Sequence, residues 1–296
     1  MRDDAALSHG VTTLPPLAVT SDDGSHFELI CVQPQGQWHQ ALLWMPAMGV
    51  PARHYLPLAQ ALAVRGIAVA IHEWRGIGSS NRRAGRHADW GYRELLRLDL
   101  PAARAGLHQL WPHATWFAGG HSLGGQIAML HAALADWPCA GVALVASGAP
   151  NWRVFRHGRW LAVAYTLAPV LARLIGHLPG RRIGFGGNEA RGVVADWSRS
   201  GRSGSYAARG VPVDLEDALA KVCVPIIGVR LADDWLAPTA SLTHLLDKAP
   251  LAPRTVVTLT AQDFAGVPAT HFSWMGAPAP VAAALARWFD RADTSA

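Results

Sequence analysis

The segment Gly120-His121-Ser122-Leu123-Gly124 indicates how this chain folds. It follows an apolar run at residues 115–118 and opens a helical pattern at residues 123–135, so Ser122 is expected at a sharp turn from a strand into a helix. Such a turn strains the backbone of its central residue, and glycines two positions before and after it remove side chains that would collide. The pattern therefore predicts a serine whose hydroxyl is held out at the edge of a sheet.

Apolar, β-rich runs alternate with helical patterns along the rest of the chain, which is typical of an α/β protein with a mostly parallel sheet flanked by helices. We expect strands at residues 27–32, 41–45, 67–72, 115–119, 141–146, 225–230 and 255–260. We expect helices at residues 55–64, 92–110, 123–135, 237–246 and 280–289.

Residues 151–222 break this alternation, because they contain no convincing strand. They are interpreted as an insertion between a first part of the core, residues 1–150, and a second part, residues 223–296. Within the insertion we expect an amphipathic helix at 160–176, a glycine-rich loop at 179–188 and a second helix at 188–199.

The basic character of the chain is concentrated in this insertion. Residues 151–210 contain ten arginines against Glu189 and Asp196, a local net charge of +8, whereas the whole chain has a net charge of +5. The arginines are not interleaved along a recognisable nucleic-acid-binding module, so we expect no nucleic-acid partner.

Composition excludes several other classes of protein. With 296 residues, 50% hydrophobic and 16% charged, the chain can bury a large core, yet no apolar run reaches the roughly 18 residues of a membrane span. Three cysteines are too few for a disulfide framework, and the histidines lack the spacing of a zinc site, so we expect no metal and no cofactor. Residues 1–4 lack the basic and apolar regions of a signal peptide, which predicts a cytoplasmic location.

A serine hydroxyl is a weak nucleophile at neutral pH, so Ser122 needs a histidine to take its proton and a carboxylate to orient that histidine. The expected strand at 225–230 is followed by Asp233 and Asp234, either of which could supply the carboxylate. The last expected strand is followed by His271, which is the candidate base because of its position. Ser, Asp and His thus follow one another in this order along the chain.

With these residues the chain resembles the α/β-hydrolase fold superfamily, in particular the bacterial branch similar to serine aminopeptidases and monoacylglycerol lipases. In such relatives the acid is followed three residues later by proline, which fits Asp234 and Pro238 and favours Asp234, with Asp233 as the alternative. The resemblance also implies that residues 151–222 form a lid over Ser122. In that lid, aromatic and aliphatic side chains could line an acyl or aromatic pocket, or most of them could instead pack against the main domain: Trp152, Phe155, Trp160, Tyr165, Leu167 and Leu171.

The loop at residues 72–80 resembles the family's loop of the form Asp, any, Arg-Gly, any, Gly, any, Ser, whose role is architectural. We therefore expect Arg75 to bond backbone carbonyls or a nearby acid, and His72 to be structural. His121 is expected to support the turn, because a side chain next to the nucleophile in sequence points away from its hydroxyl.

Negative charge on a tetrahedral intermediate requires backbone N–H donors, the oxyanion hole. One donor is expected to be Leu123. The second should come from the loop at residues 45–50, where alignment by length to Tyr55 favours Met48 and leaves Gly49 open. Here the chain departs from the family, in which a His-Gly pair usually occupies this loop.

These observations predict a serine hydrolase that transfers an acyl group to water from a small-molecule ester or thioester. Three alternatives remain at this stage: an acyltransferase with the same triad, an aminopeptidase-like amidase, and a binding protein without activity. Fold alone does not separate them, because the same scaffold carries many functions. The oligomeric state does not follow from the sequence.

Overall fold

The computed structural model describes residues 10–134 and 138–293. Its strands are β1 (Val11–Thr13), β2 (Leu17–Thr20), β3 (His26–Pro34), β4 (Gln40–Met45), β5 (Ile67–Ile71), β6 (Thr115–His121), β7 (Cys139–Val145), β8 (Leu178–Pro179), β9 (Asn188–Glu189), β10 (Ile226–Leu231) and β11 (Arg254–Leu259). Its α-helices are α1 (Leu56–Ala63), α2 (Tyr92–Glu94), α3 (Leu100–Leu110), α4 (Leu123–Leu134), α5 (Gly158–Ile175), α6 (Gly180–Ile183), α7 (Arg191–Ser203), α8 (Leu215–Ala220), α9 (Thr239–Leu246) and α10 (Ala279–Asp293). Short 3-10 helices span Ala52–Tyr55, Trp152–Val154, Ala261–Phe264 and Ser273–Gly276, and a π-helical turn spans Leu95–Asp99.

One large sheet organises the molecule, with strand order β1-β3-β5-β4-β6-β7-β10-β11 and β2 paired to β3. The six strands from β5 to β11 run parallel, while β3 pairs antiparallel with β1, β2 and β5. The prediction of a mostly parallel sheet flanked by helices is confirmed. Parallel strands present their carboxyl ends at one edge, where the loops after β4, β6, β10 and β11 meet.

Both faces of the central sheet are covered, which explains why β4 and β5 are buried at every position without alternation. In β4, Leu42 and Trp44 point to the cluster formed with α1 and α10, whereas Leu43 and Met45 point to the cluster formed with α3, α4, α8 and α9. This alternation follows from the two-residue period of a strand. The core is therefore two apolar layers, one on each side of the sheet.

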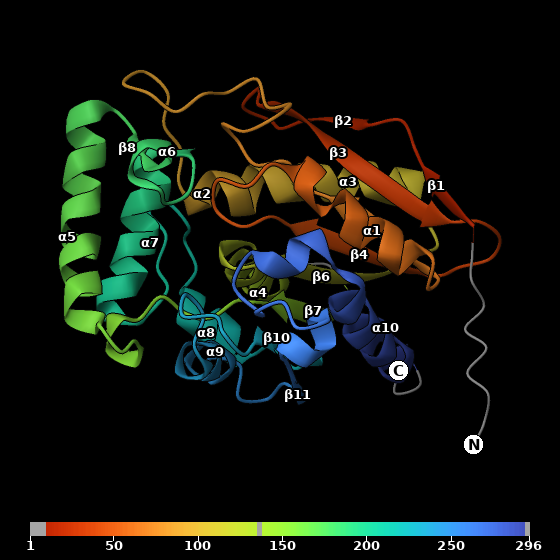
Figure 1. Cartoon of the computed structure of the whole chain (residues 1–296). Coiled ribbons are helices and arrows are strands. Elements are labelled where there is room, and N and C mark those ends of the chain that lie inside the picture. The colour runs from red at the N-terminus through yellow and green to blue at the C-terminus, as the bar shows by residue number, and fades with distance from the viewer. Residues whose placement is uncertain (1–9, 135–137, 294–296) are drawn as a thin grey trace.

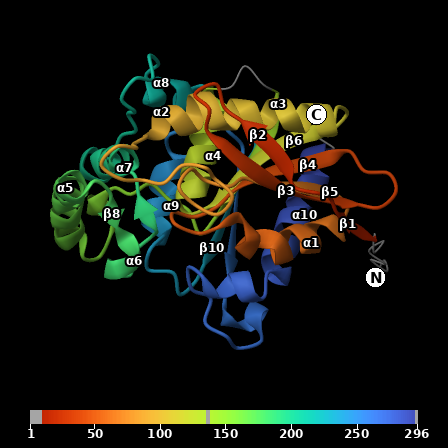
Figure 2. The same ribbon diagram turned by 90° about the horizontal axis from the view of Figure 1, so that it is seen from above.

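Segment 151–222 contributes helix α8 to one of these layers, whereas most of it lies outside them. Helices α5, α6 and α7 lie together beside the edge of the sheet, at the opposite end of the molecule from β1 and α10 (Figures 1 and 2). The segment also contains the two-stranded ribbon β8–β9 and helix α8, which packs on α4.

Several elements differ from those expected. The sequence did not indicate β1 and β2, which are short and pair only with β3 at the edge of the sheet. The helix expected at 92–110 is interrupted by the π-helical turn, where Leu100 donates its N–H to Leu95 five residues earlier and Pro101 has no N–H to continue the regular pattern. Within 179–199, α6 interrupts the expected loop and β9 precedes α7. The expected end of α4 at Ala135 lies outside the described residues, as do residues 1–4.

Two further features concern the cysteines and the length of the helices. Cys31 and Cys139 are buried, but Cys223 is exposed. Among the helices described, none has the length and apolar character required to cross a bilayer.

Candidate active site

Ser122 occupies the tight turn between β6 and α4. Its φ of 56° is in the left-handed region, which a residue with a side chain adopts only when its surroundings enforce it. The neighbouring glycines explain how the turn fits: a Cβ on Gly120 would overlap the backbone of Gly124, and a Cβ on Gly124 would overlap the carbonyl of Met45. The strand, the turn and the start of α4 can approach this closely only without those two side chains.

Asp234 and His271 form a buried pair from the loops after β10 and β11. The Nδ1 atom of His271 lies 2.7 Å from Oδ2 of Asp234. The other carboxylate oxygen accepts the backbone N–H groups of Leu236 and Ala237, which fixes its orientation. Because an ionised carboxylate can only accept hydrogen bonds, this contact favours the tautomer of a neutral imidazole that carries its proton on Nδ1 and can accept one at Nε2.

Asp233 has a different set of contacts although it is next in sequence. Its side chain is exposed, and Oδ2 accepts the backbone N–H of Ala269 at 2.9 Å. Its own N–H donates to the carbonyl of Ala269. Asp233 thus joins the two loops, whereas Asp234 contacts His271.

Ser122 and His271 line the same cavity, which has a volume of about 350 Å³. Its walls are mostly apolar, and no Asp or Glu is among the described residues that line it. The lining consists of Ala47, Met48, Ser122, Gln126, Ala146, Gly148, Pro150, Phe155, Leu161, Tyr165, Gly184, Phe185, Gly186, Trp197, Trp235, Leu236, Ala237, His271 and Phe272.

Segment 151–222 contributes much of that wall. Of the six side chains singled out from the sequence, Phe155 and Tyr165 line the cavity. Trp160, Leu167 and Leu171 are exposed instead, and Trp152 lies under the guanidinium of Arg153. Five further wall residues of this segment were not singled out from the sequence: Leu161, Gly184, Phe185, Gly186 and Trp197.

The candidate oxyanion donors lie close to Ser122 in the fold. Leu123 is the first residue of α4, so its N–H has no acceptor within the helix, and the first helical bonds to the carbonyl of Ser122 come from Gly125 and Gln126. In the loop after β4, Met48 lines the cavity together with Ser122. Gly49 has a φ of 75° and lies against the backbone of Gly186 and Gly187.

His121 lies behind the turn in a buried network that the sequence did not reveal. The Tyr55 hydroxyl accepts the N–H of Ala47 at 2.9 Å and forms a second hydrogen bond, also of 2.9 Å, with Nδ1 of His121. Burial lowers the pKa of His121 well below its ordinary value, so the ring is neutral. Its ring centroid lies 4.7 Å from that of His271, and Trp274 donates to the His271 carbonyl. The network thus connects the loop after β4, the turn and the candidate base.

His72 and Arg75 lie outside the cavity. His72 packs between Phe27 and Trp74, and burial lowers its pKa to about 3. The guanidinium of Arg75 bonds two carboxylates, Asp99 at 2.6 Å and Asp23 at 2.6 Å. It therefore connects the loop after β5 to the β2–β3 turn and the π-helical turn.

Within residues 10–134 and 138–293, no three His, Cys, Asp or Glu side chains are grouped so as to hold a metal ion.

Comparison with known families gives one match. The family model described as serine aminopeptidase, S33, matches residues 36–196. This range is more than half of the chain and includes Ser122 and α5, but it ends before Asp234 and His271. No curated protein matches the sequence.

Solved structures with a similar fold include several esterases. The esterase domain of a Rhodothermus marinus protein has a TM-score of 0.62 at 16% identity, covering 95% of this chain and 98% of that one. A thermophilic esterase from Thermogutta terrifontis has a TM-score of 0.59 at 16% identity, covering 94% and 99%. Est1E from Butyrivibrio proteoclasticus, solved with ferulic acid, has a TM-score of 0.62 at 15% identity, covering 93% and 99%. At these identities the similarity establishes the fold.

Proposed function

The chain belongs to the serine aminopeptidase S33 family of α/β hydrolases, and on this premise we propose that it cleaves a carboxylic ester or thioester through an acyl-enzyme on Ser122. The observation that carries the proposal is the cavity lined by both Ser122 and His271, with His271 bonded to the buried Asp234. A binding protein without activity has no need for these three groups in these loops.

The reaction follows from the roles of these groups. The Oγ atom of Ser122 attacks the carbonyl carbon while Nε2 of His271 takes the serine proton, and Asp234 stabilises the resulting imidazolium. The N–H groups of Leu123 and Met48 donate to the oxyanion. Collapse of the intermediate expels the alcohol or thiol, which takes the proton from His271. Water, deprotonated by His271, then attacks the acyl-enzyme and releases the acid and free Ser122.

The chemistry of the cavity favours an ester over an aminoacyl amide. An aminopeptidase must recognise a charged α-amino group, and an unpaired ammonium in an apolar wall is costly. No carboxylate lies among the described lining residues to pair with it, whereas six of those residues are Phe, Tyr or Trp. We infer that the acyl group is apolar or aromatic, and that residues 151–222 act as a lid that contacts it.

The test is covalent labelling with a fluorophosphonate probe, with the modified residue identified by mass spectrometry. We expect labelling of the native protein at Ser122, and none of Ser122→Ala or of heat-denatured protein. Labelling at another serine, or labelling that survives denaturation, would contradict an activated Ser122. Hydrolysis of esters, thioesters and aminoacyl amides, with and without an added alcohol acceptor, then separates hydrolase, amidase and acyltransferase.

A further inference from the structure

The outer face of α5 is apolar and is exposed to solvent. The exposed fraction reaches 76% for Trp160, 59% for Leu167 and 68% for Leu174. The spacing of these side chains follows the helical period, so they form one stripe along the helix. We call this stripe the outer α5 face; it consists of Trp160, Val163, Leu167, Val170, Leu171 and Leu174.

The opposite face of α5 already makes the contacts that hold the helix. Tyr165 is buried and packs edge to face against Trp197 of α7 at 4.8 Å. Pro169 has no N–H for the Tyr165 carbonyl, and the guanidinium of Arg202 in α7 donates to that oxygen at 2.6 Å instead. Because α5 is packed and hydrogen-bonded on its inner side, the exposed leucines on its outer side contribute nothing to this packing.

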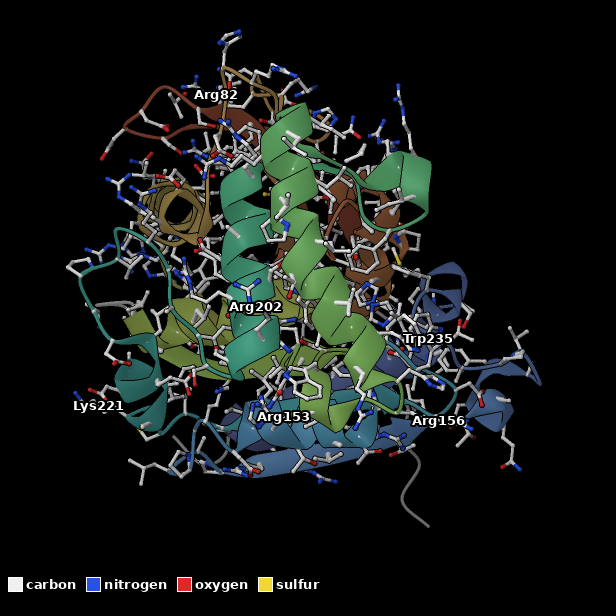
Figure 3. The ribbon with its side chains drawn as sticks, turned by 90° about the vertical axis from the view of Figure 1, so that its left-hand side faces the viewer. Arg82, Arg153, Arg156, Arg202, Lys221 and Trp235 are labelled. Carbon is white, nitrogen blue, oxygen red and sulfur yellow. The ribbon has the colours of Figure 1, made fainter. Side chains whose placement is uncertain are left out.

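Arginines lie near both ends of the outer α5 face, with Arg156 and Arg159 at its N-terminal end and Arg173 in the last turn of the helix. Figure 3 shows Arg153 and Arg156 near the N-terminal end of α5 and Arg202 beside the helix. Arg156, Arg159 and Arg173 are exposed, and none of the three forms an ion pair with any residue that the structure describes. Apolar side chains flanked by free guanidinium groups are the combination with which a helix binds in the plane of a lipid surface, where arginines meet phosphate groups.

We propose that the outer α5 face docks on an anionic lipid surface. Charge favours this occupant over a second copy of the chain, since a symmetric contact through α5 would bring together two copies of residues 151–210, each with a net charge of +8. Anionic headgroups instead neutralise the arginines while the acyl region takes up Trp160 and the leucines.

The mouth of the cavity, like the outer α5 face, exposes apolar side chains to solvent. Phe185, Trp235 and Phe272 line the cavity and are exposed, and Trp235 is visible on the same side of the molecule as α5 (Figure 3). Leu161 and Tyr165, on the same helix as the outer α5 face, also line the cavity. Docking through α5 would therefore bring apolar side chains of the cavity rim to the same surface, although docking itself requires no turnover.

The experiment is co-sedimentation with phosphatidylcholine vesicles, with and without phosphatidylglycerol, in a Ser122→Ala background that prevents lipid hydrolysis. We expect binding to the anionic vesicles that weakens with salt, because the arginine contribution is screened. Leu167→Gln together with Leu174→Gln should weaken binding by about 100-fold, at about tenfold for each leucine no longer buried. Glutamine is a good helix former, so α5 is preserved.

Matched controls separate docking from general surface effects. Leu110→Gln with Leu251→Gln changes two exposed leucines elsewhere, and binding should be unchanged. Arg156→Glu with Arg159→Glu should abolish the preference for anionic vesicles, whereas Arg97→Glu with Arg287→Glu, at other exposed sites, should weaken it far less. Each variant is first required to keep the thermal midpoint of its parent.

Three results would overturn the proposal. They are no binding of the parent to anionic vesicles, equal loss of binding in the leucine variants and their controls, and a dimer in sedimentation equilibrium that the α5 leucine variant dissociates. The last result would assign the outer α5 face to a second copy of the chain.

Discussion

Asp233 and Asp234 have adjacent positions in the sequence but different contacts in the structure. Asp234 is buried and bonds His271, whereas Asp233 is exposed and bonds the backbone of Ala269. We predict that Asp234→Asn lowers kcat for a soluble ester by about 10³- to 10⁴-fold, because an amide no longer stabilises the imidazolium or fixes the tautomer of His271. Asp233→Asn should retain activity within a few-fold, since an amide oxygen can still accept the N–H of Ala269.

Initial rates for the two variants, measured beside their thermal midpoints, check this prediction. Both variants should unfold close to the temperature of the parent. Equal loss of kcat in both, or loss only in Asp233→Asn, would show that the pair at 2.7 Å is not the catalytic pair.

At the scale of elements, Gly49 joins the loop after β4 to the loop before β9. A Cβ on Gly49 would overlap the backbone of Gly186 and Gly187, and its φ of 75° disfavours any side chain. We predict that Gly49→Ala lowers the free energy of unfolding by about 2 kcal/mol more than Gly36→Ala. Gly36 is the matched control, because it has a φ of 86° but no atom within 4 Å of an added Cβ.

Urea unfolding of the two alanine variants measures this difference directly. Gly49→Ala should also lower kcat, because separating the loops displaces the N–H of Met48, whereas Gly36→Ala should leave kcat unchanged. Equal stability of the two variants would mean that the loops separate without cost and that the close approach is not part of the folded state.

At the scale of the whole molecule, buried histidines couple folding to pH. Burial lowers the pKa of His72 to about 3 and that of His131 to about 4, and it lowers the pKa of His121 well below its ordinary value. Below pH 6.5 the unfolded chain binds protons that the folded chain does not, so stability falls as the pH falls. The buried carboxyls of Glu73, Asp99, Glu189 and Asp196, whose pKa is raised by burial, oppose this loss at lower pH.

A substitution of His72 measures how much a single histidine contributes to this pH dependence of stability. Neither ring nitrogen has a hydrogen-bond partner among the described residues, so His72→Phe removes a titrating group without breaking such a bond. Between pH 7 and pH 5 the variant should lose about 2 kcal/mol less stability than the wild type, from one proton taken up at an unfolded pKa near 6.5. Urea titrations at the two pH values give the comparison, and identical losses would mean that His72 is protonated in the folded protein.

Much of the fold could be predicted because its signals are local. The parallel strands are short apolar runs between turns, and helix α5 ends at Gly176 with a φ of 104°, which a glycine adopts readily. The edge strands β1 and β2 could not be predicted, because three or four residues carry too little periodicity to separate a strand from a loop. The π-helical turn was missed because Pro101 disrupts hydrogen bonds without changing the apolar pattern.

In the candidate site, too, some features follow from the local sequence and others from tertiary contacts. The sequence by itself determined the turn at Ser122, since Gly120 and Gly124 allow a strained residue wherever a strand meets a helix. Only the tertiary structure decided which aspartate bonds His271, which aromatic side chains of 151–222 line the cavity, and that Tyr55 connects Ala47 to His121. The physical reason is the separation of the interacting residues along the chain. The strain at Ser122 depends on residues next to it in sequence, whereas these contacts join residues that are distant in sequence and meet only because of the order of strands in the sheet.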